Sequence, residues 1–193
     1  MHTRDSMNRR TEKLVDLQLA ANELELQKEL IQALAIESKK QELNHSAQIE
    51  EVELLSRLLT AGFCSESLSA LELFPIAFVA WASGSVTDPE RKVVMGSLVD
   101  YGLLINQASN DRFQGWLETR PNRELFLLWK DYVTAKLNPV SSEVRYAIGI
   151  RLLKKSMQVA MTSGGLLGFG TICEAEQLIL DEISEVFGIE GFF

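Results

Sequence analysis

The sequence predicts an all-α protein, a compact helical bundle preceded by a long helical arm. Apolar residues recur every three or four positions through most of the chain, and no segment shows the period-two alternation of a half-buried strand. Helix-breaking residues are scarce, with 4 prolines and 12 glycines in 193 residues and none between about residues 9 and 60. A chain of this size usually forms one core domain with room for an appended element.

The composition disfavours several classes of function. A formal net charge of -8 argues against a nucleic-acid binder, which needs a basic face to displace the counterions of the phosphates. The 2 cysteines, Cys64 and Cys173, belong to no C-x-x-C pair or Cys/His cluster, so a zinc site is not indicated. The longest strongly apolar run, residues 73–82, is too short to span a bilayer. We therefore expect reduced thiols in a cytoplasmic protein.

The N-terminal third of the chain predicts an arm. Residues 1–8 are polar, and we expect them to be disordered. Residues 9–61 are rich in Leu, Ala, Glu, Gln and Lys and predict a helical, partly coiled-coil-like segment with a break near residues 44–46. Apolar residues at heptad spacing form a seam on this segment. The seam consists of Leu17, Leu24, Ile31 and Leu34.

A seam of two to three heptads is marginal on an isolated helix, so the arm needs a surface to pack against. That surface is a second copy of the chain, a partner protein or the chain's own core, and the sequence leaves these alternatives open.

The remaining residues, 62–193, predict about six core helices. Gly62 is expected to close the arm as a left-handed cap. Ser69 and Glu72 have the spacing of a capping box, and Pro75 falls in the first turns of the helix that follows, where its missing N–H costs least. This helix is apolar nearly all round, which predicts that it is the central, buried one. The later helices are expected to span residues 87–106, 110–119, 122–137, 141–161 and 174–187.

One turn occurs twice. Residues 82–90 and residues 162–174 each combine a helix end, a small-residue turn and the pattern Thr-x-x-Glu, which is typical of a capped helix start. In the first copy a proline also follows the capping threonine, as helix starts favour. The residues assigned to these turns and caps are Ser83, Gly84, Thr87, Gly164, Gly165 and Thr171.

The chemistry available to the chain is limited. Its 2 histidines, His2 and His45, lie in the arm, so a catalytic triad has no base in the core. The Gly-rich second turn follows a helix and lacks Lys-Ser/Thr, which disfavours a phosphate loop. Carboxylates beside the turns could hold a divalent cation, although capping and the helix dipole fully explain Glu90 and Glu174 and are the favoured interpretation. The candidate metal ligands are Asp88, Glu90, Glu174 and Glu176.

Two stretches resemble the signature segments of the TerB-like (tellurite-resistance TerB) domain. They are residues 77–90, AFVAWASGSVTDPE, and residues 160–180, AMTSGGLLGFGTICEAEQLIL. The resemblance covers about residues 62–190. It implies an all-helical bundle of two similar halves, no established enzymatic activity, metal binding by acidic residues, and roles in tellurite and other stress responses. Ser83 stands where the family usually carries Asp, which weakens the first metal site.

From these observations we expect a non-enzymatic helical interaction or scaffold protein, TerB-like over residues 62–193, in a stress-response or membrane-linked complex. A divalent-cation sensor is the first alternative. A peripheral membrane adaptor is the second, through an apolar tail at residues 192–193 and a basic stripe on the helix expected at residues 141–161. The stripe consists of Arg145, Arg151, Lys154 and Lys155.

Overall fold

The computed structural model describes residues 2–102, 106–163 and 172–191, and confirms the all-α class. Within these ranges the chain forms eight α-helices and a one-turn 3-10 helix, η1, and no strand. The chain divides into two units, Met1–Glu42 and Leu43–Phe193.

The first unit is the greater part of α1 (His2–Ala47), a helix of 46 residues. Residues 2–8 belong to this helix in the structure, although the sequence predicts disorder for residues 1–8. The reason is that no proline or glycine separates them from the strong helix formers that follow, and a helix propagates more easily than it nucleates. Nearly every side chain described between residues 18 and 42 is exposed.

The second unit begins at Leu43, about twenty residues before the predicted boundary at residue 62. Leu43 and Ala47 are buried, and so are three leucines of α2 (Val52–Thr60). The break in the helix lies just after Ala47, and not at residues 44–46 as predicted. It coincides with Gln48, which has a φ of 56°. The last turn of α1 and all of α2 therefore belong to the bundle, because their apolar side chains are part of its core.

The centre of the second unit is α3 (Leu68–Ala80), which follows η1 (Ser65–Ser67). Eleven of its thirteen residues are buried, as its all-round apolar pattern predicts. The other two are Ser69 and Glu72, and they do not form the predicted capping box. Instead Ser69 Oγ lies 2.8 Å from Ser109 Oγ, and Glu72 contacts Lys136.

Five further helices surround α3. They are α4 (Asp88–Asp100), α5 (Gln107–Glu118), α6 (Arg123–Leu137), α7 (Ser142–Ser163) and α8 (Glu174–Phe187). The helix predicted for residues 87–106 ends earlier, at Asp100, with Gly102 in the left-handed region at a φ of 70°. The next helix starts earlier than predicted, because Asn106 caps it by accepting a hydrogen bond from Ser109 N at 3.1 Å.

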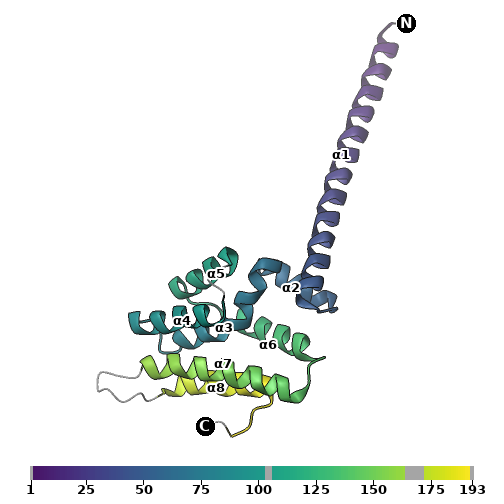
Figure 1. Ribbon diagram of the computed structural model, residues 1–193. Coiled ribbons are helices and arrows are strands. Elements are labelled where there is room, and N and C mark those ends of the chain that lie inside the picture. The colour runs from purple at the N-terminus through teal and green to yellow at the C-terminus, as the bar shows by residue number, and fades with distance from the viewer. Residues whose placement is uncertain (1, 103–105, 164–171, 192–193) are drawn as a thin grey trace. The chain divides into compact units, whose positions relative to one another are not determined.

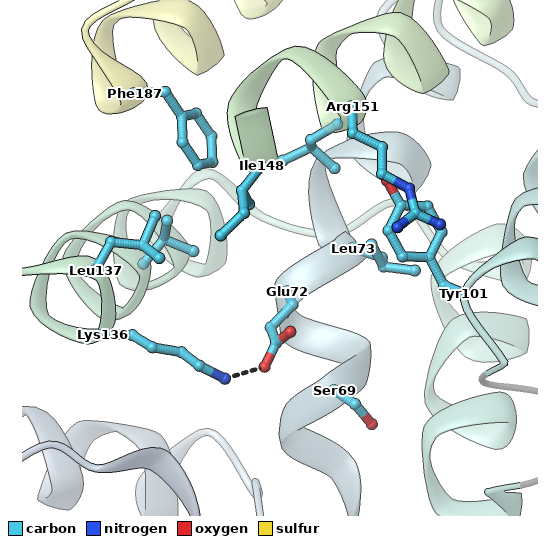
Figure 2. Close-up of a pocket in the computed structure, with 11 residues that line it drawn as sticks. Ser69, Glu72, Leu73, Tyr101, Lys136, Leu137, Ile148, Arg151 and Phe187 are labelled. Carbon is cyan, nitrogen blue, oxygen red and sulfur yellow. Dashed lines mark hydrogen bonds and ion pairs between the residues drawn. The ribbon is translucent and has the colours of Figure 1, made fainter. Parts of the chain in front are cut away.

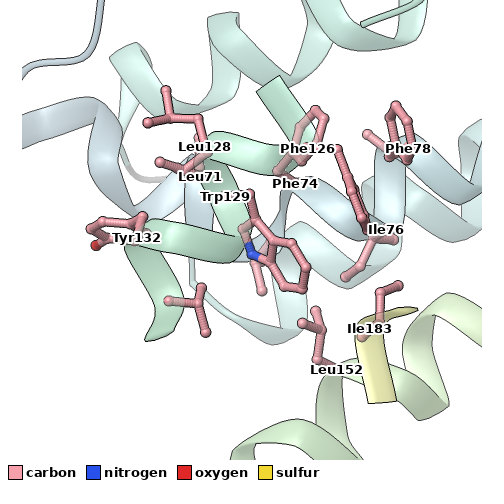
Figure 3. Close-up of a cluster of buried hydrophobic side chains, with 14 of the residues drawn as sticks. Leu71, Phe74, Ile76, Phe78, Phe126, Leu128, Trp129, Tyr132, Leu152 and Ile183 are labelled. Carbon is pink, nitrogen blue, oxygen red and sulfur yellow. The ribbon is translucent and has the colours of Figure 1, made fainter. Parts of the chain in front are cut away.

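In Figure 1, α3 lies between α5 on one side and α7 on the other, with α7 and α8 side by side. The core between them is rich in aromatic rings. Phe126 of α6 stacks on Phe78 of α3 at 4.7 Å between centroids, and Trp129 lies 5.2 Å from Phe126. Figure 3 shows these rings with Leu152 of α7 and Ile183 of α8 facing them. The aromatic side chains thus join helices that are far apart in the sequence.

Helices α7 and α8 approach each other closely at Gly149. A Cβ atom added there would lie 2.5 Å from Phe187 Cβ and 2.8 Å from Ile189 Cδ1. Gly115 of α5 is exposed, and a Cβ there would meet nothing within 4 Å.

We predict opposite effects for two glycine-to-alanine substitutions. Gly115→Ala should raise the free energy of unfolding by about 0.5–1 kcal/mol, because alanine is the better helix former. Gly149→Ala should lower it by about 1–3 kcal/mol, because the methyl group forces α7 and α8 apart. Urea unfolding of the two variants checks this, and a stabilised Gly149→Ala would contradict the packing of these helices.

Candidate functional site

The first predicted turn forms as expected and is held by its own residues. Gly84 has a φ of 103°, which favours glycine, and Ser83 Oγ donates to Ser85 O at 3.3 Å. Thr87 caps α4, and its N–H and hydroxyl donate to Glu90 Oε2 at 2.6 Å and 2.7 Å. Glu90 is fully buried in this capping box. The turn is therefore a structural device that starts a helix.

The second turn lies partly outside the described residues, and so do Gly164, Gly165 and Thr171. The structure does show where the next helix starts. Cys173 is the N-cap of α8, and its N–H donates to Glu176 Oε2 at 2.8 Å. The box therefore lies two residues after the predicted Thr171–Glu174 pair. Glu176 is buried like Glu90, and each is the third residue of its helix, so the two turns share this feature.

The four predicted metal ligands are not brought together. Glu90 and Glu176 are buried in separate capping boxes, whereas Asp88 and Glu174 are exposed on first turns. Over the residues that the structure describes, no three His, Cys, Asp or Glu side chains gather in a way that could hold a metal ion. Calcium and magnesium need several converging oxygens, which these positions do not supply.

The seam residues of α1 are exposed over more than half of their surface. The exposed fractions are 55% for Leu24, 66% for Ile31 and 61% for Leu34, while the Leu17 side chain lies outside the described part. Further large apolar side chains on the same helix are exposed as well. They are Leu19, Leu26, Leu30 and Ile36.

The second unit contains a cavity of about 370 Å³ between α3, α6 and α7. Figure 2 shows its lining side chains around an open centre. Most of the wall is apolar. The lining residues are Ser69, Glu72, Leu73, Tyr101, Val133, Lys136, Leu137, Ile148, Arg151, Leu152 and Phe187.

One side of the cavity carries an ion pair. Lys136 of α6 contacts Glu72 of α3, as the dashed line in Figure 2 marks. The Tyr132 hydroxyl donates to Glu72 Oε1 at 3.3 Å. Burial, together with the negative charge of Glu72, raises the pKa of Tyr132 well above its ordinary value, so the hydroxyl keeps its proton. The charges of Glu72 and Lys136 compensate each other.

The opposite side carries a single cation. The Arg151 guanidinium carbon lies 4.2 Å from the centroid of the Tyr101 ring, and Figure 2 shows the two groups stacked. Arg151 Nη2 donates to Asp100 O at 3.4 Å, and the Asp100 carboxylate pairs with Lys155. Burial raises the pKa of Tyr101, and the positive charge of Arg151 opposes that rise. The guanidinium is thus oriented by a ring, with its charge not matched by a carboxylate among the interactions described.

Sequence reasoning did not find this cavity. It placed Arg151 in a basic stripe with Arg145, Lys154 and Lys155. In the structure Arg145 donates to Leu137 O at 2.9 Å and Lys155 pairs with Asp100, so the stripe is divided among different contacts. No local pattern could have joined Arg151 to Tyr101, because they are fifty residues apart.

Among the described residues, no single helix is long and apolar enough to cross a membrane. One bent pair, Val52–Thr60 and Ser65–Ala80, meets the length and composition criteria with an 83° bend between its two helices.

Comparison with protein-family models, with curated proteins and with solved structures finds no match to this chain. The TerB-like resemblance therefore stays a prediction.

The position of the second capping box gives a direct test. We predict that Glu176→Ala lowers the free energy of unfolding by about 1–2 kcal/mol, because it removes the buried carboxylate that accepts the hydrogen bond of the Cys173 N–H. Glu174→Ala should change it by less than about 0.5 kcal/mol, because that side chain is exposed. Thermal or urea unfolding measures both free energies. A larger loss of stability in Glu174→Ala would contradict this assignment and support the Thr171–Glu174 capping box that the sequence predicts.

Proposed function

We propose that this protein is a non-enzymatic helical interaction protein that associates with a second copy of itself through the seam of α1. The observation that carries the proposal is the exposure of Leu24, Ile31 and Leu34 on one long helix. Each such side chain contributes about 1.5–3 kcal/mol when it is fully buried. A run of exposed apolar residues on a helix is typical of an association surface.

The heptad positions support a parallel pair of helices. With Leu17, Leu24 and Ile31 at the a positions, Glu23 falls at g and Lys28 at the following e. In a parallel coiled coil these two positions face each other across the seam, so opposite charges there favour the pairing.

The pattern also limits the length of the seam. The next g and e positions, Leu30 and Ala35, carry no charge. One heptad further on the a position is Ser38, and the g and e positions beside it, Glu37 and Glu42, are both acidic. The proposed contact therefore covers about residues 17–34. A contact of this length is short, so we expect association that depends on protein concentration.

The non-enzymatic part of the proposal is supported by the positions of the histidines. His2 belongs to the first unit, and His45, although it lies in the second unit, is exposed on the last turn of α1 and does not line the cavity. The TerB-like core, and with it a place in a stress-response or membrane-linked complex, belongs to the proposal as a prediction from the two resembling segments.

Two single substitutions on α1 test the association. Ile31 and Leu26 are exposed to nearly the same extent, 66% and 65%, but lie about 140° apart around a helix of 3.6 residues per turn. Ile31→Glu should abolish association, because it places two like charges in the seam. Leu26→Glu should leave it intact. Sedimentation equilibrium over a range of concentrations measures the mass.

The melting temperature of the bundle should be the same in both variants, since both side chains are exposed. A wild-type protein that is monomeric at every concentration, or equal losses in the two variants, would contradict the proposed seam.

The pairing of Glu23 with Lys28 has its own test. We predict that Lys28→Glu weakens association and that adding Glu23→Lys to it restores the wild-type dissociation constant, because the double variant again has opposite charges at g and e. If the double variant is weaker than the single one, the helices do not pair in the parallel orientation.

A further inference from the structure

The cavity between α3, α6 and α7 carries an inference that does not depend on the α1 seam. We propose that it binds a small amphipathic carboxylate, with the apolar body along the side chains of α6, α7 and α8 and the carboxylate at Arg151. All of its lining residues belong to the second unit.

The size and the wall of the cavity determine the apolar part of this ligand. Its volume of about 370 Å³ lies in the range of small-molecule sites, which are mostly apolar with a few polar groups that orient the ligand. Leu137, Ile148 and Phe187 border the open centre in Figure 2. This space suits a hydrocarbon body of about eight carbons.

The charges determine the head group. Glu72 and Lys136 neutralise each other on one side, and the Asp100 carboxylate is matched by Lys155 outside the cavity. The lining of the cavity therefore has a net charge of about one positive unit, which comes from Arg151. An anion is favoured over a neutral or cationic group of the same length.

The geometry of Arg151 favours a carboxylate in particular. One face of the Arg151 guanidinium lies against the ring of Tyr101. The N–H groups along the edge of the guanidinium, which form a fork of donors, therefore do not face the ring. The structure describes one hydrogen bond from this side chain, to Asp100 O. A planar carboxylate can accept two parallel N–H bonds from such a fork, and a pre-oriented arginine loses less entropy on binding.

Three ligands of equal length test the head group on the full chain. We expect calorimetry to show octanoate binding at a 1:1 ratio, and octanol and octylammonium binding at least about tenfold more weakly, which corresponds to about 1.4 kcal/mol. No binding of octanoate, or equal binding of octanol, would overturn the proposal. This comparison needs no variant, so it does not depend on how a substitution affects folding.

Variants then locate the site. Arg151→Met keeps an apolar stem without the charge, and should reduce octanoate binding to the level of octanol. Arg151→Lys should retain part of the preference, because it keeps the charge but not the fork. Arg120→Met, at an exposed cation that does not line the cavity, should bind like the wild type. Unchanged binding by Arg151→Met would overturn the assignment of the head group.

The apolar part has a separate test. Ile148 lines the cavity and is 42% exposed, so Ile148→Trp should fill the space with little strain and abolish binding of all three ligands. The Ile31→Glu variant of α1 should bind octanoate like the wild type. If Ile148→Trp binds octanoate normally while remaining folded, the ligand lies elsewhere.

Discussion

The burial of α3 is the constraint on which the second unit depends. A helix that is apolar on every side gains stability only when other elements cover all of its faces, and α5, α6 and α7 do so here. The aromatic rings of α6 meet those of α3, and Trp116 of α5 makes an edge contact with Phe74 at 5.0 Å between centroids. The positions of α4 and α8 follow from the parts of α3 and α7 that each of them covers.

The two residues of α3 that are not buried explain why the bundle contains a cavity. Ser69 and Glu72 lie one turn apart on the same face of the helix, and both line the cavity. A carboxylate there cannot be covered by apolar side chains without a large desolvation cost. Lys136 and Tyr132 of α6 instead provide polar partners. The polar interruption of an otherwise apolar helix thus leaves a concave site with an ion pair on one side and an arginine stacked on Tyr101 on the other.

Much of the local structure could be predicted, and the failures share a cause. The Thr87–Glu90 box and the left-handed Gly62 both form, because each depends on hydrogen bonds or dihedral angles within a few residues. The domain boundary was misplaced because the sequence of residues 43–61 resembles the arm, and only the burial of its leucines in the bundle separates it. The second capping box was misplaced because Glu174 and Glu176 are both compatible with local rules, and burial selects Glu176.

The sequence by itself determined the all-α class, the central place of α3, and the heptad spacing of Leu24, Ile31 and Leu34, because these follow from periodicity along one helix. That this seam is exposed was decided by the structure. Only the tertiary structure decided which side chains meet. Glu72, Lys136, Tyr101 and Arg151 come from different segments of the chain, and their neighbours in sequence carry no sign of the cavity that they line. Helix packing brings them together, since the faces that converge are set by how α6 and α7 cover α3 and not by any local pattern.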